Sequence, residues 1–311
     1  MNLAVARGVL ALIVGAVSLN AIAQPVEVTL QSALTRAMGT QRGAAVVLDV
    51  HSGRVLASSH LEVAARRVAA PGSSIKPFTL LALLESGKVN AQTALVCKRS
   101  VSISGHKLDC SHPVTSEPLD PAAALAYSCN SYFTTVALRL SPEDLRKSFL
   151  HDGFASPTEL APGEATGMVA LAKSPQQEQL QAIGEWGVQV TPLELLKGYR
   201  SLALLQPRHN EKLSQLFIGL KQSVAYGMGH EAQPGQLMKV AGKTGTAPAD
   251  EGTWTHAWFA GYAPAQNPEI VLVVFLEKGH GSDAAVVARQ VFDAFAKRHD
   301  SSGSQARGAQ P

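Results

Sequence analysis

The sequence lacks a strong charge imbalance, and after its first 23 residues it lacks any apolar run long enough to span a membrane. Charged residues make up only 16% of the 311 residues, and the formal net charge is +3. Lysine and arginine are scattered rather than striped, which argues against a nucleic-acid partner. Hydrophobic residues reach 46%. That is enough to bury one large core, or two lobes that share one, so we expect a globular protein.

The first 23 residues differ from the rest of the chain. Arg7 is their one charged side chain, residues 8–19 are apolar, and Ala21-Ile22-Ala23 has the small-x-small pattern that precedes cleavage. This pattern is typical of a signal peptide, and the apolar run is short for a bilayer. We therefore expect cleavage after Ala23 and a soluble mature protein that is periplasmic or secreted.

Cysteine is scarce, and its three positions are Cys97, Cys110 and Cys129. Cys97 and Cys110 bracket a short polar loop, so in an oxidising compartment we predict a disulfide between them. A bridge closing a loop of that size contributes about 3 kcal/mol of stability. Cys129 is then expected to be a small buried thiol.

The same loop contains a rival arrangement. Cys97, His106, Cys110 and His112 are all residue types that zinc accepts as ligands. Their spacing matches no common zinc pattern, and secretion favours the bridge. We therefore predict the disulfide and no metal site.

Strand signals occur at both ends of the chain, around a helical middle. Residues 44–50 and 54–58 favour strands, and Ser52-Gly53 supplies a turn between them. Helical signals dominate up to about residue 230. They include helix starts at Ser141-Pro142 and at Thr191-Pro192, the second with a capping box. Strand-like segments return at 236–247, 255–264 and 269–277, followed by amphipathic helical spacing at 282–299.

This order predicts an α+β fold. Both termini contribute strands to one antiparallel sheet, helices flank the sheet, and a mainly helical lobe is inserted between its strands. A cleft between lobe and sheet is a natural place for a site. There is no internal repeat, and residues 300–311 are small and polar, so we expect a disordered tail.

One candidate site begins in "APGSSIKPFTLLALLESG", residues 70–87, where Ser73 and Lys76 open a predicted helix that Gly87 ends. A serine hydroxyl is a weak nucleophile until a neighbouring group accepts its proton. Burial lowers the pKa of a lysine, so its neutral amine can accept that proton. Positions three apart share a helix face. The same pattern at Ser104 and Lys107 lies in a polar loop. The plainer alternative makes Ser73 a helix cap and Lys76 a surface lysine.

A second candidate is "AYSCNSYF", which contains Ser128-Cys129-Asn130. If the backbone is not regular helix there, the hydroxyl and the amide can both project into a cleft, one to pass a proton and one to hold a peptide group. The alternative is an ordinary loop serine and turn asparagine.

A third candidate is "AGKTGTA", which places Lys243, Thr244, Gly245 and Thr246 on a predicted strand. An ammonium beside two hydroxyls makes an anion-binding row, and a glycine within a strand marks close approach of a ligand or another backbone. The alternative is a surface strand with a bulge.

With these motifs the chain resembles the serine acyltransferase family of penicillin-binding proteins and serine β-lactamases. That family carries Ser-x-x-Lys, a Ser-x-Asn-type motif and Lys-Thr-Gly. All three occur here in that order. The resemblance covers residues 43–297 and extends to "VVLDVHSGRVLA", "WGVQVTPLELL" and "HAWFAGYAP". It implies one transpeptidase-like catalytic domain at 24–299, after a signal peptide at 1–23 and before a tail at 300–311.

The resemblance implies a nucleophilic mechanism. Ser73 attacks the carbonyl of a D-alanyl-D-alanine stem peptide, and D-alanine leaves. Lys76 takes the serine proton, Ser128 relays a proton to the leaving amine, and Lys243 shapes the local field.

The remaining motif residues are implied to bind substrate. Asn130 holds the substrate amide or Lys76, Thr244, Gly245 and Thr246 form the row for the terminal carboxylate, and the backbone N–H groups of Ser73 and Thr246 form the oxyanion hole. No cofactor or metal is implied. Expected partners are peptidoglycan stem peptides, β-lactam antibiotics as acylating inhibitors and, since the family's usual additional domain is not seen, a cell-wall synthesis protein that localises this module.

The second half-reaction leaves alternatives open. An amine acceptor gives a D,D-transpeptidase, which Cys129 in the middle of the second motif favours. Water as acceptor gives a serine β-lactamase or D,D-carboxypeptidase. Four glutamates lie in the relevant interval without a family signature, namely Glu159, Glu164, Glu178 and Glu185. A further alternative is a non-catalytic penicillin-binding sensor or wall-binding module.

Overall fold

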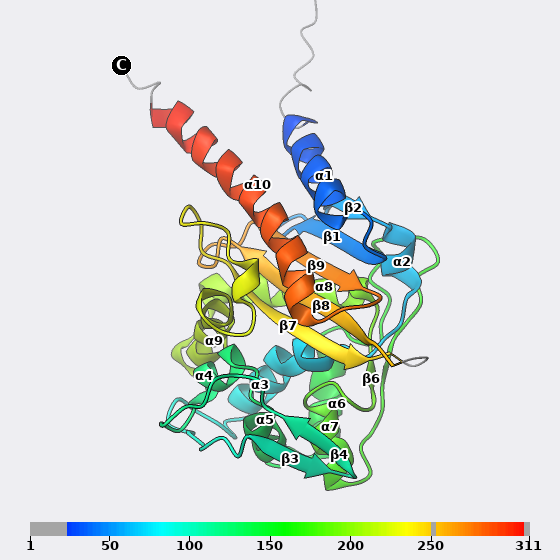
Figure 1. Cartoon of the computed structure of the whole chain (residues 1–311), viewed down its shortest axis with the longest axis vertical. Coiled ribbons are helices and arrows are strands. Elements are labelled where there is room, and N and C mark those ends of the chain that lie inside the picture. Colours follow the sequence, from blue (N-terminus) through cyan, green and yellow to red (C-terminus); the bar gives the residue numbers. More distant parts are fainter. Residues whose placement is uncertain (1–23, 250–252, 308–311) are drawn as a thin grey trace, which may run out of the picture.

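The computed structural model describes residues 24–249 and 253–307, so the expected signal peptide lies outside the described residues. Within them, a five-stranded antiparallel sheet has the order β2-β1-β9-β8-β7 and carries helices on both faces (Figure 1). Two strands come from the start of the chain and three from its end, which confirms the predicted α+β architecture. The strands are β1 (Gly43–Asp49), β2 (Val55–Ser59), β7 (Ala241–Pro248), β8 (Thr255–Ala263) and β9 (Ile270–Leu276).

Both faces of the central strands are buried, and alternate side chains serve two separate cores. In β1, Ala45 and Val47 face one core while Val46 and Leu48 face the other. Successive side chains of a strand point to opposite faces, so a strand covered on both sides has apolar residues at nearly every position. This explains the uninterrupted apolar sequence of β9.

Helices α1 (Gln24–Met38) and α10 (Gly281–Arg307) run beside each other over one face of the sheet (Figure 1). They bury Leu34 and Phe292 against that face. Helix α10 continues to Arg307, so it includes the first part of the segment expected to be a disordered tail; residues 308–311 lie outside the described residues.

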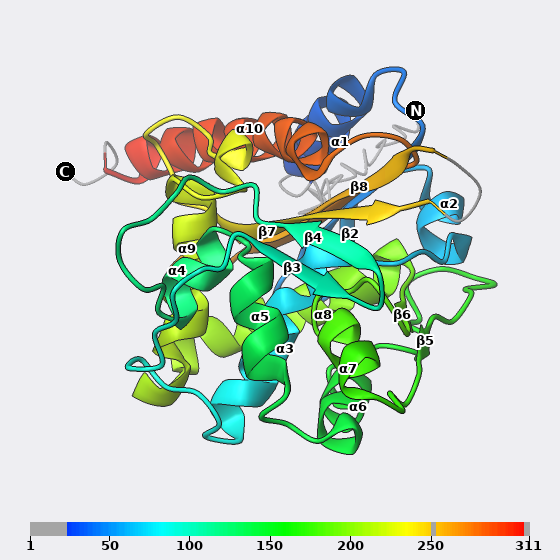
Figure 2. The same cartoon turned by 60° about the horizontal axis from the view of Figure 1, so that its bottom comes forward.

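The other face carries the predicted helical lobe, which Figure 2 shows beneath the sheet. Two small two-stranded antiparallel sheets also lie in this half of the molecule. The helices are α2 (Leu61–Arg66), α3 (Lys76–Glu85), α4 (Pro121–Ala126), α5 (Asn130–Ala137), α6 (Pro142–His151), α7 (Pro175–Gln181), α8 (Pro192–Leu205) and α9 (Ser214–Ala225). The strands of these sheets are β3 (Ser100–Ile103) and β4 (His106–Asp109), which form a hairpin, and β5 (Met168–Val169) and β6 (Val188–Gln189), which helix α7 separates in the chain. The 3₁₀ turns are η1 (Gly72–Ile75), η2 (Gln206–Arg208), η3 (Glu211–Leu213) and η4 (His230–Ala232), the last of which packs against α10.

Local capping signals in the sequence are confirmed. Ser141 accepts a hydrogen bond from the Asp144 N–H at the start of α6, and Thr191 and Glu194 form the predicted capping box at α8. None of the helices within residues 24–249 and 253–307 combines the length and apolar character needed to cross a bilayer.

The lobe and the sheet meet where turn η1 packs on strand β7. Gly72 has φ +51°, and a Cβ on it would lie 2.3 Å from the Thr246 carbonyl oxygen. A Cβ on Gly245 would lie 2.4 Å from the Pro71 carbonyl oxygen. Real Cβ atoms do not approach oxygen so closely, so glycine at both positions lets two backbones touch. The prediction that Gly245 marks a close approach is confirmed.

We predict that Gly72→Ala destabilises the fold more than Gly87→Ala. Gly87 also has a positive φ, +70°, but nothing lies within 4 Å of a Cβ placed there. Gly87→Ala should therefore cost only left-handed backbone strain, about 1–2 kcal/mol. Gly72→Ala adds overpacking, about 1–3 kcal/mol more. Urea unfolding curves of the two variants measure the difference, and equal losses would contradict this account of the contact.

Candidate active site

A cavity of about 180 Å³ lies where turn η1, the connection from α4 to α5, and strand β7 converge. Ser73 lines it from the turn, Ser128 from the connection and Asn130 from the start of α5. Thr244 and Thr246 line it from the strand. The three sequence motifs, far apart along the chain, therefore meet at one place.

Ser73 lies in a 3₁₀ turn rather than at the start of an α-helix. The predicted helix over 73–86 begins only at Lys76, whose backbone N–H donates to the Ser73 carbonyl. In a 3₁₀ turn, residues three apart eclipse one another, so this geometry stacks the two side chains more directly than an α-helix does. Within the described chain, no hydrogen bond joins Lys76 Nζ to Ser73.

Lys76 is fully buried, so the alternative of a surface lysine is wrong. Its Nζ donates to the Ser128 carbonyl at 2.8 Å and to Asn130 Oδ1 at 2.7 Å, and lies 3.2 Å from Ser128 Oγ. Burial disfavours the ammonium form and lowers the pKa of Lys76 to about 8, although nearby groups such as Cys129 and Glu185 act in the opposite direction. A substantial fraction of this amine is therefore neutral near pH 8.

Ser128 has a left-handed backbone conformation, with φ 55°. A non-glycine residue in this region carries about 1–2 kcal/mol of strain. The conformation interrupts the helical path between α4 and α5, so the Ser128 carbonyl and hydroxyl both lie close to Lys76. Asn130 opens α5 and also donates from Nδ2 to the Asp109 carbonyl at 3.1 Å. The alternative of an ordinary loop serine and turn asparagine does not account for this convergence.

Strand β7 contributes two threonines, a buried lysine and a glycine to this region. Thr244 and Thr246 line the cavity, and the Thr246 hydroxyl accepts a hydrogen bond from the Gly281 N–H at 2.9 Å, which leaves its own proton available. Lys243 is fully buried and donates to the Thr244 carbonyl at 3.0 Å. Burial, and then the charge of Lys76, hold the pKa of Lys243 well below its usual range. Gly245 packs against the turn that carries Ser73.

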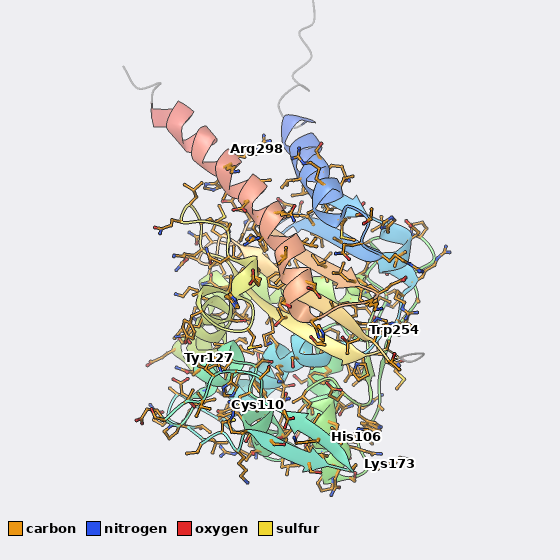
Figure 3. All side chains as sticks on the ribbon, in the orientation of Figure 1. His106, Cys110, Tyr127, Lys173, Trp254 and Arg298 are labelled. Carbon is orange, nitrogen blue, oxygen red and sulfur yellow. The ribbon has the colours of Figure 1, made fainter. Side chains whose placement is uncertain are left out.

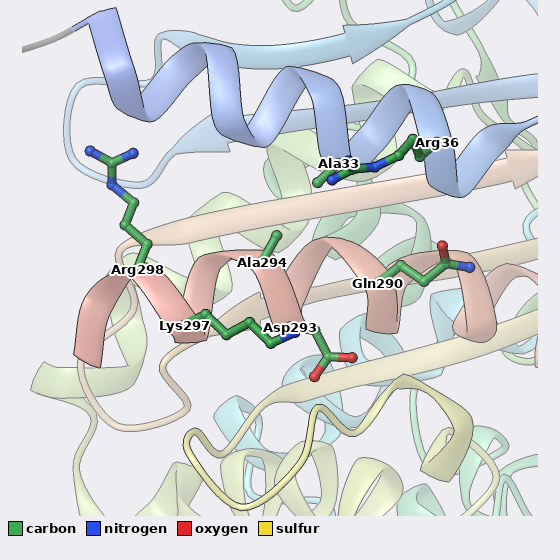
Figure 4. Close-up of a pocket in the computed structure, with 7 residues that line it drawn as sticks. All are labelled: Ala33, Arg36, Gln290, Asp293, Ala294, Lys297 and Arg298. Carbon is green, nitrogen blue, oxygen red and sulfur yellow. The ribbon is translucent and has the colours of Figure 1, made fainter. Parts of the chain in front are cut away.

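A larger cavity, about 600 Å³, lies along α1 and α10 on the other face of the sheet (Figure 4). Arg36, Gln290, Asp293, Lys297 and Arg298 line it. No serine, cysteine or threonine is among the described residues that line it, so the cavity at Ser73 is the better candidate active site.

The family model for the penicillin binding protein transpeptidase domain matches residues 43–297. The chain belongs to this family.

Curated relatives are named as peptidoglycan D,D-transpeptidases. PbpA of Mycobacterium tuberculosis is 27% identical, over 72% of this chain and 54% of its own length. MrdA of Acinetobacter baumannii is 24% identical, over 85% of this chain and 52% of its own length. This penicillin-binding protein chain thus spans about half the length of these curated relatives.

Solved structures share the fold. PBP2 of Pseudomonas aeruginosa superposes with a TM-score of 0.76 at 24% identity, covering 86% of this chain and 76% of that one. A protein of Burkholderia ambifaria described as a peptidoglycan glycosyltransferase gives a TM-score of 0.78 at 21% identity, covering 89% and 96%. The sheet and lobe described above are therefore those of a penicillin-binding protein transpeptidase domain.

Four further residues line the cavity in this family member: Asp109, Ser111, Glu185 and Met228. Glu185 was one of four candidate glutamates, and burial raises its pKa, with Lys76 opposing. Glu164 instead accepts hydrogen bonds from backbone N–H groups of its own loop, including Leu160 and Ala161. No local sequence signal marks the other three residues, because only the tertiary fold brings them to Ser73.

The predicted Cys97–Cys110 disulfide is wrong, since all three cysteines are free thiols. Cys110 turns inward to Cys129, with 3.8 Å between the two sulfur atoms. Cys129 is a buried free thiol, as expected, and its sulfur lies beside that of Cys110. His106 lies at the other end of β4 from Cys110, exposed to solvent (Figure 3).

We predict that Ser128→Gly is more stable than Ser128→Ala by about 1 kcal/mol, because both variants lose the hydroxyl but only glycine relieves the left-handed strain. Thermal denaturation of the two proteins measures this difference. If alanine is at least as stable as glycine here, the backbone of Ser128 is not strained.

Proposed function

We propose that this chain is a serine D,D-transpeptidase. It cleaves the terminal D-alanyl-D-alanine bond of peptidoglycan stem peptides through an acyl-enzyme on Ser73. The observation that supports this proposal is the convergence of Ser73, the buried Lys76 amine held by Ser128 and Asn130, and the two β7 threonines at one cavity.

In the first step, neutral Lys76 accepts the proton of the Ser73 hydroxyl while Ser73 Oγ bonds to the substrate carbonyl carbon. The carbonyl oxygen becomes an oxyanion, which the backbone N–H groups of Ser73 and Thr246 stabilise. One such donor contributes about 3 kcal/mol to lowering the barrier. The contact of η1 with β7 through Gly72 fixes these two N–H groups relative to each other.

Collapse of the tetrahedral adduct breaks the C–N bond, and the departing D-alanine needs a proton on its amine. Ser128 Oγ lies 3.2 Å from Lys76 Nζ, which gives the proton a path from Lys76 through Ser128 to the amine. The Thr244 and Thr246 hydroxyls bind the terminal carboxylate, next to the Lys243 side chain buried in the same strand. Asn130 holds the Lys76 amine through Oδ1, which is one of the two roles that the resemblance implied for it.

An amine of a second stem peptide then attacks the acyl-enzyme and forms the cross-link. Strand β7 is an edge of the sheet in the described chain. An edge strand can pair with an extended peptide, so β7 is a suitable template for the donor chain. β-Lactams would acylate the same serine, the enzyme would act in the periplasm, and a cell-wall synthesis protein would bring it to its substrate.

Hydrolysis is a second candidate, because Glu185 also lines the cavity and its carboxyl could hold a water near the acyl carbon. A D,D-carboxypeptidase or β-lactamase would result. Rapid loss of a penicillin adduct, with Glu185→Gln prolonging it, distinguishes this activity from transfer. Catalytic release of D-alanine from a stem peptide excludes a non-catalytic sensor or wall-binding module.

We predict that benzylpenicillin forms one stable covalent adduct on wild-type protein and none on Ser73→Ala. Intact-protein mass spectrometry followed by peptide mapping locates the adduct. Ser104→Ala is the matched control, because it removes the serine of the other Ser-x-x-Lys match, in the turn of the β3–β4 hairpin. Loss of the adduct in Ser104→Ala, or its persistence in Ser73→Ala, would place the nucleophile elsewhere.

The acylation rate should rise with pH. Lys76 acts as a base only when unprotonated, and its pKa is about 8. The rate should therefore be low well below pH 8, increase about tenfold per pH unit there, and level off above it. Stopped-flow acylation by a fluorescent penicillin between pH 6 and 10 gives the profile; a rate that falls as pH rises through this range would exclude Lys76 as the base.

A further inference from the structure

Four potential metal ligands lie together beside the cavity. They are Cys97, Cys110, His112 and Cys129, whose ligand atoms all lie within 4.8 Å of one another. Cys110, His112 and Cys129 are buried, with 5%, 1% and 0% exposure, and Cys97 is half-buried. They come from both sides of the β3–β4 hairpin and from the connection between α4 and α5. This size and composition match a tetrahedral zinc site with three sulfur ligands and one nitrogen ligand.

The imidazole of His112 is oriented as a ligand would be. Its Nδ1 lies 2.7 Å from the Pro113 carbonyl oxygen and 3.3 Å from Arg99 Nη1. The shorter contact is to an acceptor, so we place the imidazole proton on Nδ1. Nε2 then carries a lone pair, yet among residues 24–249 and 253–307 this buried atom has no hydrogen-bond partner. A buried acceptor without a donor is destabilising, because nothing replaces the hydrogen bond that it made to water. Histidines that ligate metals typically donate their other ring N–H to a carbonyl or carboxylate in this way.

Each of the three sulfur atoms faces a backbone N–H donor. Cys97 Sγ accepts from the Arg99 N–H at 3.3 Å, Cys110 Sγ from Ser131 at 3.5 Å, and Cys129 Sγ from Tyr132 at 3.4 Å. Such donors stabilise thiolate charge, which is the form that binds metal. The polypeptide around the cluster is thus arranged for three sulfur ligands and not for one pair.

A disulfide would join only two of the three cysteines and would give His112 no partner. Joining Cys110 to Cys129 would bring their sulfur atoms from 3.8 Å to about 2.05 Å. It would leave Cys97 unpaired and His112 Nε2 still without a partner. A single metal ion uses all four groups, and on binding the three thiols release their protons to solvent.

We propose that Cys97, Cys110, His112 and Cys129 bind one Zn²⁺ ion in a closed structural site that holds Ser128 and Asn130 in place. Cys129 lies between these two residues in sequence. Cys110 follows Asp109, whose carbonyl accepts from Asn130 Nδ2. The metal would therefore tie the β3–β4 hairpin to the segment that binds Lys76. This replaces both sequence expectations, the disulfide and the absence of a metal.

Metal content of the full chain tests the site directly. Protein purified from zinc-supplemented cells without chelators should contain about one zinc per chain by elemental mass spectrometry. Cys97→Ser and His112→Ala should bind zinc about 100-fold or more weakly, since even loss of an outer partner of a ligand costs 10- to 100-fold. His106→Ala removes an exposed histidine of the same hairpin and should retain zinc as wild type does.

Cobalt keeps the test decisive if the variants fold poorly. Wild-type protein stripped of zinc and given Co²⁺ should show sulfur-to-cobalt charge transfer and the visible bands of tetrahedral coordination. The proposal is overturned if folded, reduced wild-type protein binds neither Zn²⁺ nor Co²⁺, if peptide mapping finds a Cys110–Cys129 disulfide and reduction restores no binding, or if Cys97→Ser and His112→Ala bind zinc as wild type does.

The positioning role has its own readout. Removal of zinc should lower the melting temperature and slow acylation by benzylpenicillin, and zinc should restore both while the far-ultraviolet circular dichroism stays unchanged. Unaltered acylation and melting in the zinc-free protein would refute this role. Zinc binding without any acylation would instead refute the proposed enzymatic function and leave the metal site intact.

Discussion

The burial of one amine is the constraint on which the rest of the site depends. Lys76 enters the core at the start of α3, and its nitrogen must find acceptors there because an unpartnered buried donor is costly. The Ser128 carbonyl and Asn130 Oδ1 supply them. Ser128 takes a strained backbone conformation in the segment that supplies these groups. Desolvation that would be a liability elsewhere yields a lysine that is partly neutral at moderate pH.

A second constraint fixes the serine against the sheet. Glycines 72 and 245 allow turn η1 and strand β7 to touch backbone to backbone, so no side chain intervenes between the turn that carries Ser73 and the edge of the sheet. The lobe supplies Ser128 and Asn130 while the sheet supplies Thr244 and Thr246. The cavity is therefore a property of the junction, and neither half of the molecule contains it alone.

The cluster of Cys97, Cys110, His112 and Cys129 lies next to the residues that bind Lys76. The hairpin that carries Cys110 also provides the Asp109 carbonyl that holds Asn130, and the segment that carries Cys129 provides Ser128. A zinc ion at this point would reduce the motion of the groups that bind Lys76. Preorganisation of this kind is what a positioned proton acceptor requires.

The sequence by itself determined the features that depend on neighbours in the chain. Alternating and continuous apolar patterns placed the strands, Ser141 and Thr191 marked helix starts, and the three motifs in order indicated the family. Such signals depend on residues that lie only a few positions apart in the chain. The choice of Ser73 over Ser104 also followed from local helix signals.

Only the tertiary structure decided which distant groups meet. Lys76 bonds to residues 52 and 54 positions away, a separation that no local pattern encodes. The same holds for Glu185 among four glutamates, for Met228, and for His112 in place of His106. The disulfide prediction was wrong for this reason, because it used sequence spacing and compartment where the direction of the Cys110 side chain toward Cys129 settled the outcome. Spacing limits which residues can meet, and the packing of the lobe on the sheet selects among them.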